Sequence, residues 1–300
     1  MIILFRYLGN NFGDNLSTFI VHKVSGEHVR NVDYLPRGEV VYVVIGSILH
    51  NLPADSIVWG AGYMGANSRM RKQPLKICAV RGKLTRDQVI KQGFSCPEVY
   101  GDPALLCPKY YDPVITNKFK LGIIPHYVDQ DSVLLDRFKK DPCVLFINVR
   151  DPINKIMDEI NSCERILSSS LHGLIVADAY GIPSLWIELS DKVTGGGFKF
   201  RDYFSSVGRK NDKPLLLDNS MDMDFILNSF EDYRIQIDLD KLLEVCPFRN
   251  GSKIPIEFKY HNKFIIRKIF RNFLFRYLEK FYFKILGKIK STLLKNKQFS

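Results

Sequence analysis

The sequence predicts an α/β protein made of two Rossmann-like domains, followed by a basic amphipathic helical tail. Short runs rich in Val, Ile and Leu alternate with helix-like stretches, and glycines or polar residues follow the ends of most of these runs. One proline-containing stretch interrupts the alternation. The chain of 300 residues is long enough for two domains, and its hydrophobic content of 46% excludes disordered and fibrous classes.

The predicted strands carry apolar residues at most positions, as strands of a parallel sheet covered by helices on both faces do. They are Ile2–Tyr7, Val40–Ile45, Ser56–Trp59, Lys76–Val80, Glu98–Tyr100, Lys120–Pro125, Cys143–Asn148, Arg165–Leu167 and Ser184–Ile187. Helices are expected at Asn15–Val24, Lys83–Gln92, Ser132–Lys140, Pro152–Ser162, Leu171–Tyr180, Met221–Phe230 and Asp238–Val245. Gly93 and Gly181 stand where glycine commonly ends a helix.

The best domain boundary is Pro108–Asn117, which contains two prolines and two tyrosines. It predicts an N-terminal domain over residues 1–112 and a second domain over residues 113–258. Within the second domain, Gly195–Asp212 is expected to be a glycine-rich, basic and aromatic loop.

The N-terminus lacks the order of a signal peptide, and the longest apolar run, Val40–Leu49, is too short to span a bilayer. The six cysteines form no CxxC pair and no cluster with histidine of zinc-binding spacing. We therefore expect a cytoplasmic protein with buried thiols, no metal site and no transmembrane helix.

The positive charge is concentrated in the tail, residues 259–300. This segment holds 12 Lys and Arg against one acid, Glu279, and so accounts for the whole net charge of +11. Such a distribution argues against a nucleic-acid-binding domain and favours contact with an anionic membrane surface. The alternative is a helix that packs back onto the first domain. An apolar face opposite Arg267, Lys268 and Arg271 serves either role; it contains Ile265, Ile266, Ile269, Phe270, Phe273 and Leu274.

Two glycine-containing segments of the first domain follow predicted strands. Gly9–Asn15 opens a helix, where glycines permit close approach of a ligand and free backbone N–H groups favour anions. Trp59–Gly65 follows a buried strand, and Gly62 could admit a ligand there. For both segments an ordinary connecting turn is the alternative.

Two further strand ends of the first domain carry charged residues. Arg81 ends a strand beside a helix start, where a guanidinium is suited to bind phosphate or carboxylate. The alternative is a surface Arg paired with Asp87. Asp102 lies in an Asp-Pro turn, and a structural role in accepting backbone hydrogen bonds is favoured for it.

The strongest candidates lie in the second domain. His126 and Arg150 follow two consecutive strands, on the side of a parallel sheet where ligands bind. The segment Ser168–Gly173, with the sequence SSSLHG, supplies hydroxyls and places His172 in a first helical turn. His172 is therefore the candidate acid/base, with a buried core histidine as the alternative.

Taken together, these motifs resemble the polysaccharide pyruvyl transferase family. The resembling segments are Asn11–Asp14, Ala79–Gly82, Gly101–Leu106, Leu171–Gly173 and Ala179–Pro183, in the family's order, and Gly195–Tyr203 is similar to the exopolysaccharide branch. The resemblance implies a glycosyltransferase-B-like pair of domains, phosphoenolpyruvate as donor, a sugar of a lipid-linked polysaccharide repeat unit as acceptor, and a cyclic pyruvate ketal as product. It implies no cofactor.

On this resemblance the first domain is the acceptor side and the second the donor side. The acceptor-side residues would be Asn11, Asp14, Gly62 and Asp102. Many members have Arg directly before Leu-His-Gly, whereas this chain has Ser170. Donor binding is therefore expected from Ser169, Ser170, Arg81, Arg150, Lys199 and Arg201, and His172 would move protons with His126 in reserve.

Two other functions stay open at this point. One is a nucleotide-sugar glycosyltransferase on the same fold, because a fold does not fix the reaction. The other is a non-catalytic, membrane-associated scaffold of polysaccharide assembly. In the favoured interpretation the protein works at the inner face of the cell membrane.

Overall fold

The computed structural model describes residues 1–34, 38–115 and 118–249. The described residues all belong to one compact unit, and they form two sheets. The basic tail predicted over residues 259–300, with its membrane contact, lies outside the described residues. Within these residues, no helix is both long and apolar enough to cross a lipid bilayer.

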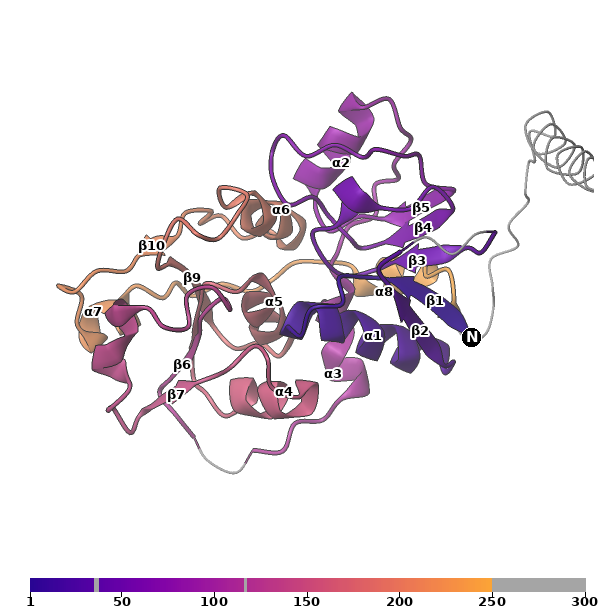
Figure 1. Ribbon diagram of the computed structural model, residues 1–300. Coiled ribbons are helices and arrows are strands. Elements are labelled where there is room, and N and C mark those ends of the chain that lie inside the picture. Colours follow the sequence, from indigo (N-terminus) through magenta and orange to yellow (C-terminus); the bar gives the residue numbers. More distant parts are fainter. Residues whose placement is uncertain (35–37, 116–117, 250–300) are drawn as a thin grey trace, which may run out of the picture. The chain divides into compact units, whose positions relative to one another are not determined.

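The first sheet is parallel and has five strands in the order β2-β1-β3-β4-β5 (Figure 1). The strands are β1 (Ile2–Phe5), β2 (Val29–Val32), β3 (Val41–Val43), β4 (Ser56–Trp59) and β5 (Lys76–Ala79). The chain passes from β1 to one side for β2 and then to the other side for β3. This reversal makes the carboxyl ends of β1 and β3 the place where such a sheet forms a ligand-binding crevice.

The second sheet repeats the same order with later strands, β10-β9-β8-β6-β7, and is also parallel. Its strands are β6 (Leu121–Ile124), β7 (Val144–Phe146), β8 (Ile166–Ser168), β9 (Ser184–Glu188) and β10 (Leu215–Leu216). Here the reversal falls between β6 and β8. The predicted α/β class with two Rossmann-like sheets is thus confirmed, and the glycosyltransferase-B-like arrangement stays a prediction.

The helices occupy most of the predicted positions. They are α1 (Phe12–Ser25), α2 (Lys83–Lys91), α3 (Cys107–Tyr110), α4 (Ile153–Asn161), α5 (Leu171–Ala179), α6 (Phe198–Val207), α7 (Met223–Asn228) and α8 (Leu239–Glu244). Three 3-10 helices are η1 (Leu49–Asn51), η2 (Pro103–Leu106) and η3 (Val133–Phe138). Helix α5 contacts α1, α4 and η2, so it joins the second sheet to elements of the first.

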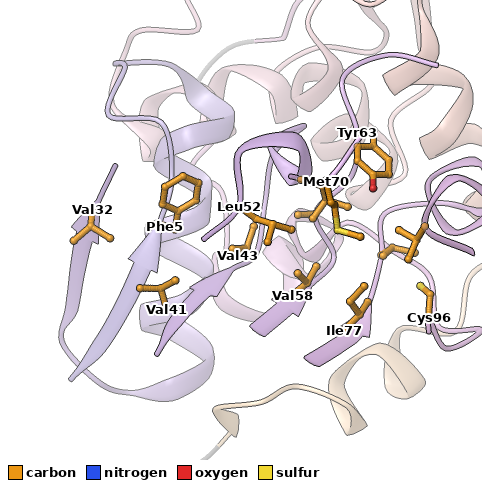
Figure 2. Packing of buried hydrophobic residues seen from close by; sticks show 14 of the residues in the cluster. Phe5, Val32, Val41, Val43, Leu52, Val58, Tyr63, Met70, Ile77 and Cys96 are labelled. Carbon is orange, nitrogen blue, oxygen red and sulfur yellow. The ribbon is translucent and has the colours of Figure 1, made fainter. Parts of the chain in front are cut away.

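A cluster of buried aliphatic and aromatic side chains fills one side of the first sheet (Figure 2). Val41, Val43 and Val58 come from adjacent strands, and Tyr63 and Met70 cover them from the loop after β4. The second sheet has its own cluster, centred on strand residues such as Ile123 and Leu167. The loops that carry the polar motifs are anchored by these two cores.

Two sequence predictions of secondary structure are wrong, and two strands were missed. The predicted loop Gly195–Asp212 contains helix α6, and the predicted strand Glu98–Tyr100 forms only an isolated bridge between Val80 and Tyr100. Strands β2 and β10 were not predicted. In α6, glycines 195–197 take left-handed φ angles and complete the turn before Phe198, after which the aromatic residues are buried and favour a helix.

The C-terminal part of the unit returns to the first sheet. The indole Nε1 of Trp59 in β4 donates a hydrogen bond of 2.9 Å to the carbonyl oxygen of Leu242 in α8. Phe248 packs edge-on against both Trp59 and Tyr42. The stretch around α8, predicted to be part of the second domain, is therefore packed on the first.

Candidate active site

A cavity of about 440 Å³ is lined by loops that follow strands of both sheets. From the first sheet come Tyr7, Asn11 and Asp14 after β1, and Gly46 and Ser47 after β3. From the second sheet come His126 and Tyr127 after β6, Ser170 and His172 after β8, and Lys192 and Lys199 from the segment after β9. The reversal points of the two sheets thus open into one cavity, as the topology predicts for ligand-binding crevices.

The start of α1 forms one wall of the cavity. The Asn11 side chain caps the helix by accepting hydrogen bonds from the backbone N–H groups of Gly13 and Asp14, and its amide donates to the Asp14 carboxylate. Gly13 lies directly against His172. A Cβ built on Gly13 would be 2.1 Å from His172 Nδ1, so only glycine lets the imidazole lie at this position.

His172, in the first turn of α5, faces the buried carboxylate of Asp102. The distance from His172 Nε2 to Asp102 Oδ2 is 3.6 Å, and neither atom has a hydrogen-bond partner among the described residues. The other oxygen, Asp102 Oδ1, accepts a hydrogen bond from the backbone N–H of Ala104. Asp102, predicted to be on the acceptor side, is completely buried and does not line this cavity, so its contact there is with the His172 ring.

Asp14 is a carboxylate on the same wall. Burial raises its pKa to about 6, while His172 and Arg6 act in the opposite direction. A carboxyl group with this pKa can both hold and release a proton near neutral pH. Asp14 and His172 therefore place two proton-carrying groups side by side in the cavity.

Lys199 supplies positive charge to the cavity. It is 7% exposed, lines the cavity from α6, and its Nζ makes no hydrogen bond or ion pair with any residue that the structure describes. Burial, with a smaller contribution from Arg81, lowers the pKa of Lys199 to about 8. A buried ammonium group without a carboxylate partner is costly unless an anion binds there.

His126 lies close enough to Lys199 for their charges to interact. Burial and Lys199 lower the pKa of His126 to about 4, so it is neutral at pH 7. Its Nδ1 accepts a long hydrogen bond of 3.4 Å from Val128 N–H, which leaves the proton on Nε2. The predicted donor residue Ser169 is 1% exposed and does not line the cavity. Its hydroxyl accepts a hydrogen bond from the His126 backbone N–H, so it holds this loop in place.

Arg81, predicted to bind the donor, is instead buried in a fixed network. Its guanidinium donates hydrogen bonds to Asp202 Oδ2 at 2.9 Å, to the Ser47 hydroxyl at 2.6 Å and to the Tyr63 carbonyl oxygen at 2.7 Å. Asp202 also accepts two hydrogen bonds from Thr85. Arg81 has no exposed surface, and it therefore joins β5 and α2 to α6 rather than contacting a ligand.

Gly62, predicted to contact the acceptor, belongs to the same network. An added Cβ would be 2.6 Å from the Arg81 guanidinium carbon, and Gly62 does not line this cavity. The absence of a side chain at Gly62 makes room for the Arg81 guanidinium rather than for a ligand.

Replacing Arg81 by Ala is expected to destabilise the fold by about 3 kcal/mol or more, because it leaves the Asp202 carboxylate buried without its ion-pair partner. The free energy of unfolding from urea titration measures this. Arg69→Ala, at an exposed arginine outside both large cavities, is the matched control and should change it by less than about 0.5 kcal/mol. Equal stability of the two variants would contradict this role.

Of the other predicted donor-binding residues, one lines the cavity and two do not. Ser170 lines the cavity at the start of α5, and its side chain makes no capping hydrogen bond. Arg150 is exposed and lies 5.8 Å from the ring of Tyr127, which is at the cavity wall. Arg201 does not line this cavity; it donates to the Gly196 carbonyl oxygen and lies over the Trp186 ring. The structure brings Lys199 and Ser170 into the cavity and leaves Arg150 and Arg201 outside it.

Sequence reasoning missed several cavity residues. Gly46 and Ser47 follow β3, and Lys192 and Thr194 follow β9. Gly46 has a left-handed φ of 119°, which only glycine adopts readily. The signal was present, because a Gly-Ser pair directly after a buried strand is typical of a crevice loop in such sheets.

The fold and the cavity define a class: a doubly wound α/β protein whose cavity joins a histidine and a carboxylate to a buried ammonium group that has no ion-pair partner among the described residues. The polysaccharide pyruvyl transferase family model matches residues 43–191. This match confirms the resemblance found in the motifs, and it supports a transferase that acts on a polysaccharide.

Two relatives extend the comparison. The chain is 28% identical over 276 residues to the "Uncharacterized protein L143" of Acanthamoeba polyphaga mimivirus, covering 88% of this chain and 93% of that protein. It is 25% identical over 213 residues to the "Succinoglycan biosynthesis protein ExoV" of Rhizobium meliloti (strain 1021), covering 66% of this chain and 62% of that protein. The second name concerns exopolysaccharide biosynthesis, in agreement with the predicted branch.

Within the described part of the chain, no group of three or more His, Cys, Asp or Glu side chains is placed to hold a metal ion.

Proposed function

We propose that this protein transfers the pyruvyl group of phosphoenolpyruvate to two hydroxyls of one sugar, forming a cyclic ketal and releasing phosphate. The acceptor is a sugar of a lipid-linked polysaccharide repeat unit, reached from the cytoplasmic face of the membrane with the help of the basic tail. The match to the family model over residues 43–191 and the similarity to a succinoglycan biosynthesis protein support this reaction class.

The observation that carries the proposal is the unpaired ammonium group of Lys199. Phosphoenolpyruvate has a carboxylate and a phosphate, so its site needs fixed positive charge. Lys199 is buried without a carboxylate partner among the described residues, and Lys192 lines the same cavity. The neutral His126 beside Lys199 can donate a hydrogen bond from Nε2 to the same anion.

The acid–base groups lie on the wall where the acceptor would enter. His172 gives a proton to the methylene carbon of phosphoenolpyruvate, and one sugar hydroxyl adds to the adjacent carbon. The bond from that carbon to the phosphate oxygen then breaks, and phosphate leaves with the electron pair. The second hydroxyl adds to the same carbon and closes the ketal. One hydroxyl proton returns to His172 and the other leaves with phosphate, so the atoms balance.

Asp14 and Asn11 suit the acceptor side. The Asp14 carboxylate lines the cavity beside His172 and can accept a hydrogen bond from a sugar hydroxyl. The amide of Asn11 donates to that carboxylate and fixes its orientation. The Asp102 carboxylate faces His172 Nε2 at 3.6 Å and is placed to favour the protonated imidazole.

A thermal-shift comparison tests the proposal, because a ligand that binds only the folded protein raises its unfolding temperature. We expect phosphoenolpyruvate to raise the unfolding temperature in a concentration-dependent manner and common nucleotide sugars to leave it unchanged. The opposite pattern would indicate a nucleotide-sugar glycosyltransferase and refute the proposal. No shift with either ligand class, together with no turnover, would favour a non-catalytic scaffold.

Replacing Gly13 by Ala is expected to lower the rate of phosphate release at least about 10²-fold, since the new methyl group must displace the His172 ring. The protein should stay folded, because alanine favours a helix. Phosphate release and circular dichroism measure the two effects.

Gly65→Ala is the matched control for this substitution. A Cβ on Gly65 meets no atom closer than 3.4 Å, so this variant should keep its activity. An active Gly13→Ala variant would show that the position of His172 does not matter for the reaction.

A further inference from the structure

A second cavity of about 440 Å³ adjoins the first. The two share Tyr7, Ile48, His50 and Asn51 in their walls, so a ligand can extend from one into the other. The second cavity lies beside the β1–α1 loop and the segment after β3, on the side of the first sheet.

This second cavity is basic. Its lining includes Arg6, Arg71 and Lys72 against one acid, Asp33, and none of these four makes an ion pair among the described residues. Arg6 Nε and His50 Nδ1 are buried atoms without a hydrogen-bond partner among those residues. Three cations and two unpartnered buried nitrogens around one hollow are the features of an anion-binding site.

The proposed reaction does not use these groups. The two anionic groups of phosphoenolpyruvate are accounted for by the cations of the first cavity, Lys199 and Lys192. Arg6 and Tyr7, which line the second cavity, directly follow β1. Asn11 and Asp14, on the proposed acceptor side of the first cavity, come next along the chain. An anion in the second cavity is therefore placed next to the acceptor rather than the donor.

We propose that the second cavity binds the phosphoryl group of a phosphorylated acceptor, a mono- or diphosphate to which the saccharide in the first cavity is attached. Arg71 and Lys72, both exposed, give the charge that attracts the phosphate, and Arg6 donates to it from the floor. The inference rests on the proposed function only in calling the saccharide the acceptor. The phosphate could be joined to a lipid or to a nucleoside, and the shared chemistry is the glycosyl phosphate.

The test is calorimetric titration of inorganic pyrophosphate into the full chain, with phosphoenolpyruvate already saturating. We expect pyrophosphate to bind the saturated protein, and the double variant Arg71→Gln/Lys72→Gln to bind it at least about tenfold more weakly. The matched control is Arg69→Gln, at an exposed arginine next to this segment that lines neither cavity. All three proteins carry the same basic tail, so their difference excludes binding by the tail.

The possible results distinguish a failure of the second anion site from a failure of the proposed function. Equal pyrophosphate affinity of wild type and double variant would overturn the second site, as would full competition between pyrophosphate and phosphoenolpyruvate. If phosphoenolpyruvate does not bind at all, the proposed function fails, while the loss of pyrophosphate binding in the double variant would still support the anion site.

Competition with two water-soluble diphosphates then identifies the source of the phosphate. Tighter displacement of pyrophosphate by farnesyl diphosphate indicates a lipid-linked acceptor, and tighter displacement by uridine diphosphate indicates a nucleotide-linked one. Displacement by neither would contradict a site for a phosphate ester.

Discussion

Replacing His172 by Ala is expected to lower the rate of phosphate release from phosphoenolpyruvate about 10²–10⁴-fold, the usual contribution of a general acid or base. The affinity for phosphoenolpyruvate should stay within about threefold, because in the proposed site the charge of the donor is bound by Lys199 and Lys192 rather than by His172. Turnover of the purified variant and calorimetric titration of the donor measure these two quantities separately.

The control for this variant is His28→Ala, at an exposed histidine outside both large cavities. A folded His172→Ala protein with near-full activity would contradict the assignment and transfer the role to His126. That transfer would be difficult chemically, since burial lowers the pKa of His126 to about 4 and keeps it uncharged at neutral pH.

The Lys199→Met variant is expected to bind phosphoenolpyruvate about 10²–10³-fold more weakly and yet to be more stable than the wild type at pH 7. The lost affinity results from removing a buried charge that pairs with the donor. The gain in stability arises because the folded protein holds this ammonium group at a pKa of about 8, below its ordinary value of 10.5. The difference corresponds to about 3 kcal/mol of destabilisation when the group is charged.

The pH dependence of the Lys199 effect has a definite sign. Below pH 8 the lysine is charged in both the folded and the unfolded chain, and the folded state carries the full penalty. Between pH 8 and 10.5 the unfolded chain binds more protons than the folded one, so the free energy of unfolding rises with pH. The wild type should therefore approach the stability of Lys199→Met across this range, and donor affinity should fall as pH rises above 8.

Lys210→Met is the matched control, because Lys210 is exposed and lines neither cavity. It should leave donor affinity unchanged and show no such convergence. Urea titrations from pH 7 to 10 give the stability curves. A Lys199→Met protein that binds phosphoenolpyruvate as the wild type does would remove the main support for the proposed donor site.

Much of the fold could be predicted from the sequence because buried parallel strands have a strong local signature. Runs such as Ser56–Trp59 are apolar on both faces, and β4 has these bounds. Strand β2, with the sequence VRNV, is only partly buried at three of its four residues and lacks this signature. Helix α6 was not predicted because the three glycines before it and its basic residues are typical of a loop. Its aromatic residues are buried by tertiary packing, which local sequence does not show.

The site could be predicted only in part. His172 was found by type and position and Lys199 as a substitute for the family's arginine, and the structure places both in the cavity. Arg81 was misjudged because local sequence cannot show a partner as distant along the chain as Asp202, 121 residues away. Local sequence also could not show why Gly62 and Gly13 are glycines. The missing side chains make room for Arg81 and His172, respectively, rather than for a ligand.

The central claim is that the cavity joins the pyruvyl group of phosphoenolpyruvate to a saccharide. The most direct measurement traces phosphoenolpyruvate, isotope-labelled at its methylene carbon, during incubation with the full chain and a lipid-linked saccharide fraction from polysaccharide-producing cells. The account predicts that the label appears as the methyl group of an acid-labile saccharide ketal, with one phosphate released for each ketal formed, and that neither product appears with His172→Ala. Release of phosphate with free labelled pyruvate and no saccharide product, or label that stays in phosphoenolpyruvate, would contradict it.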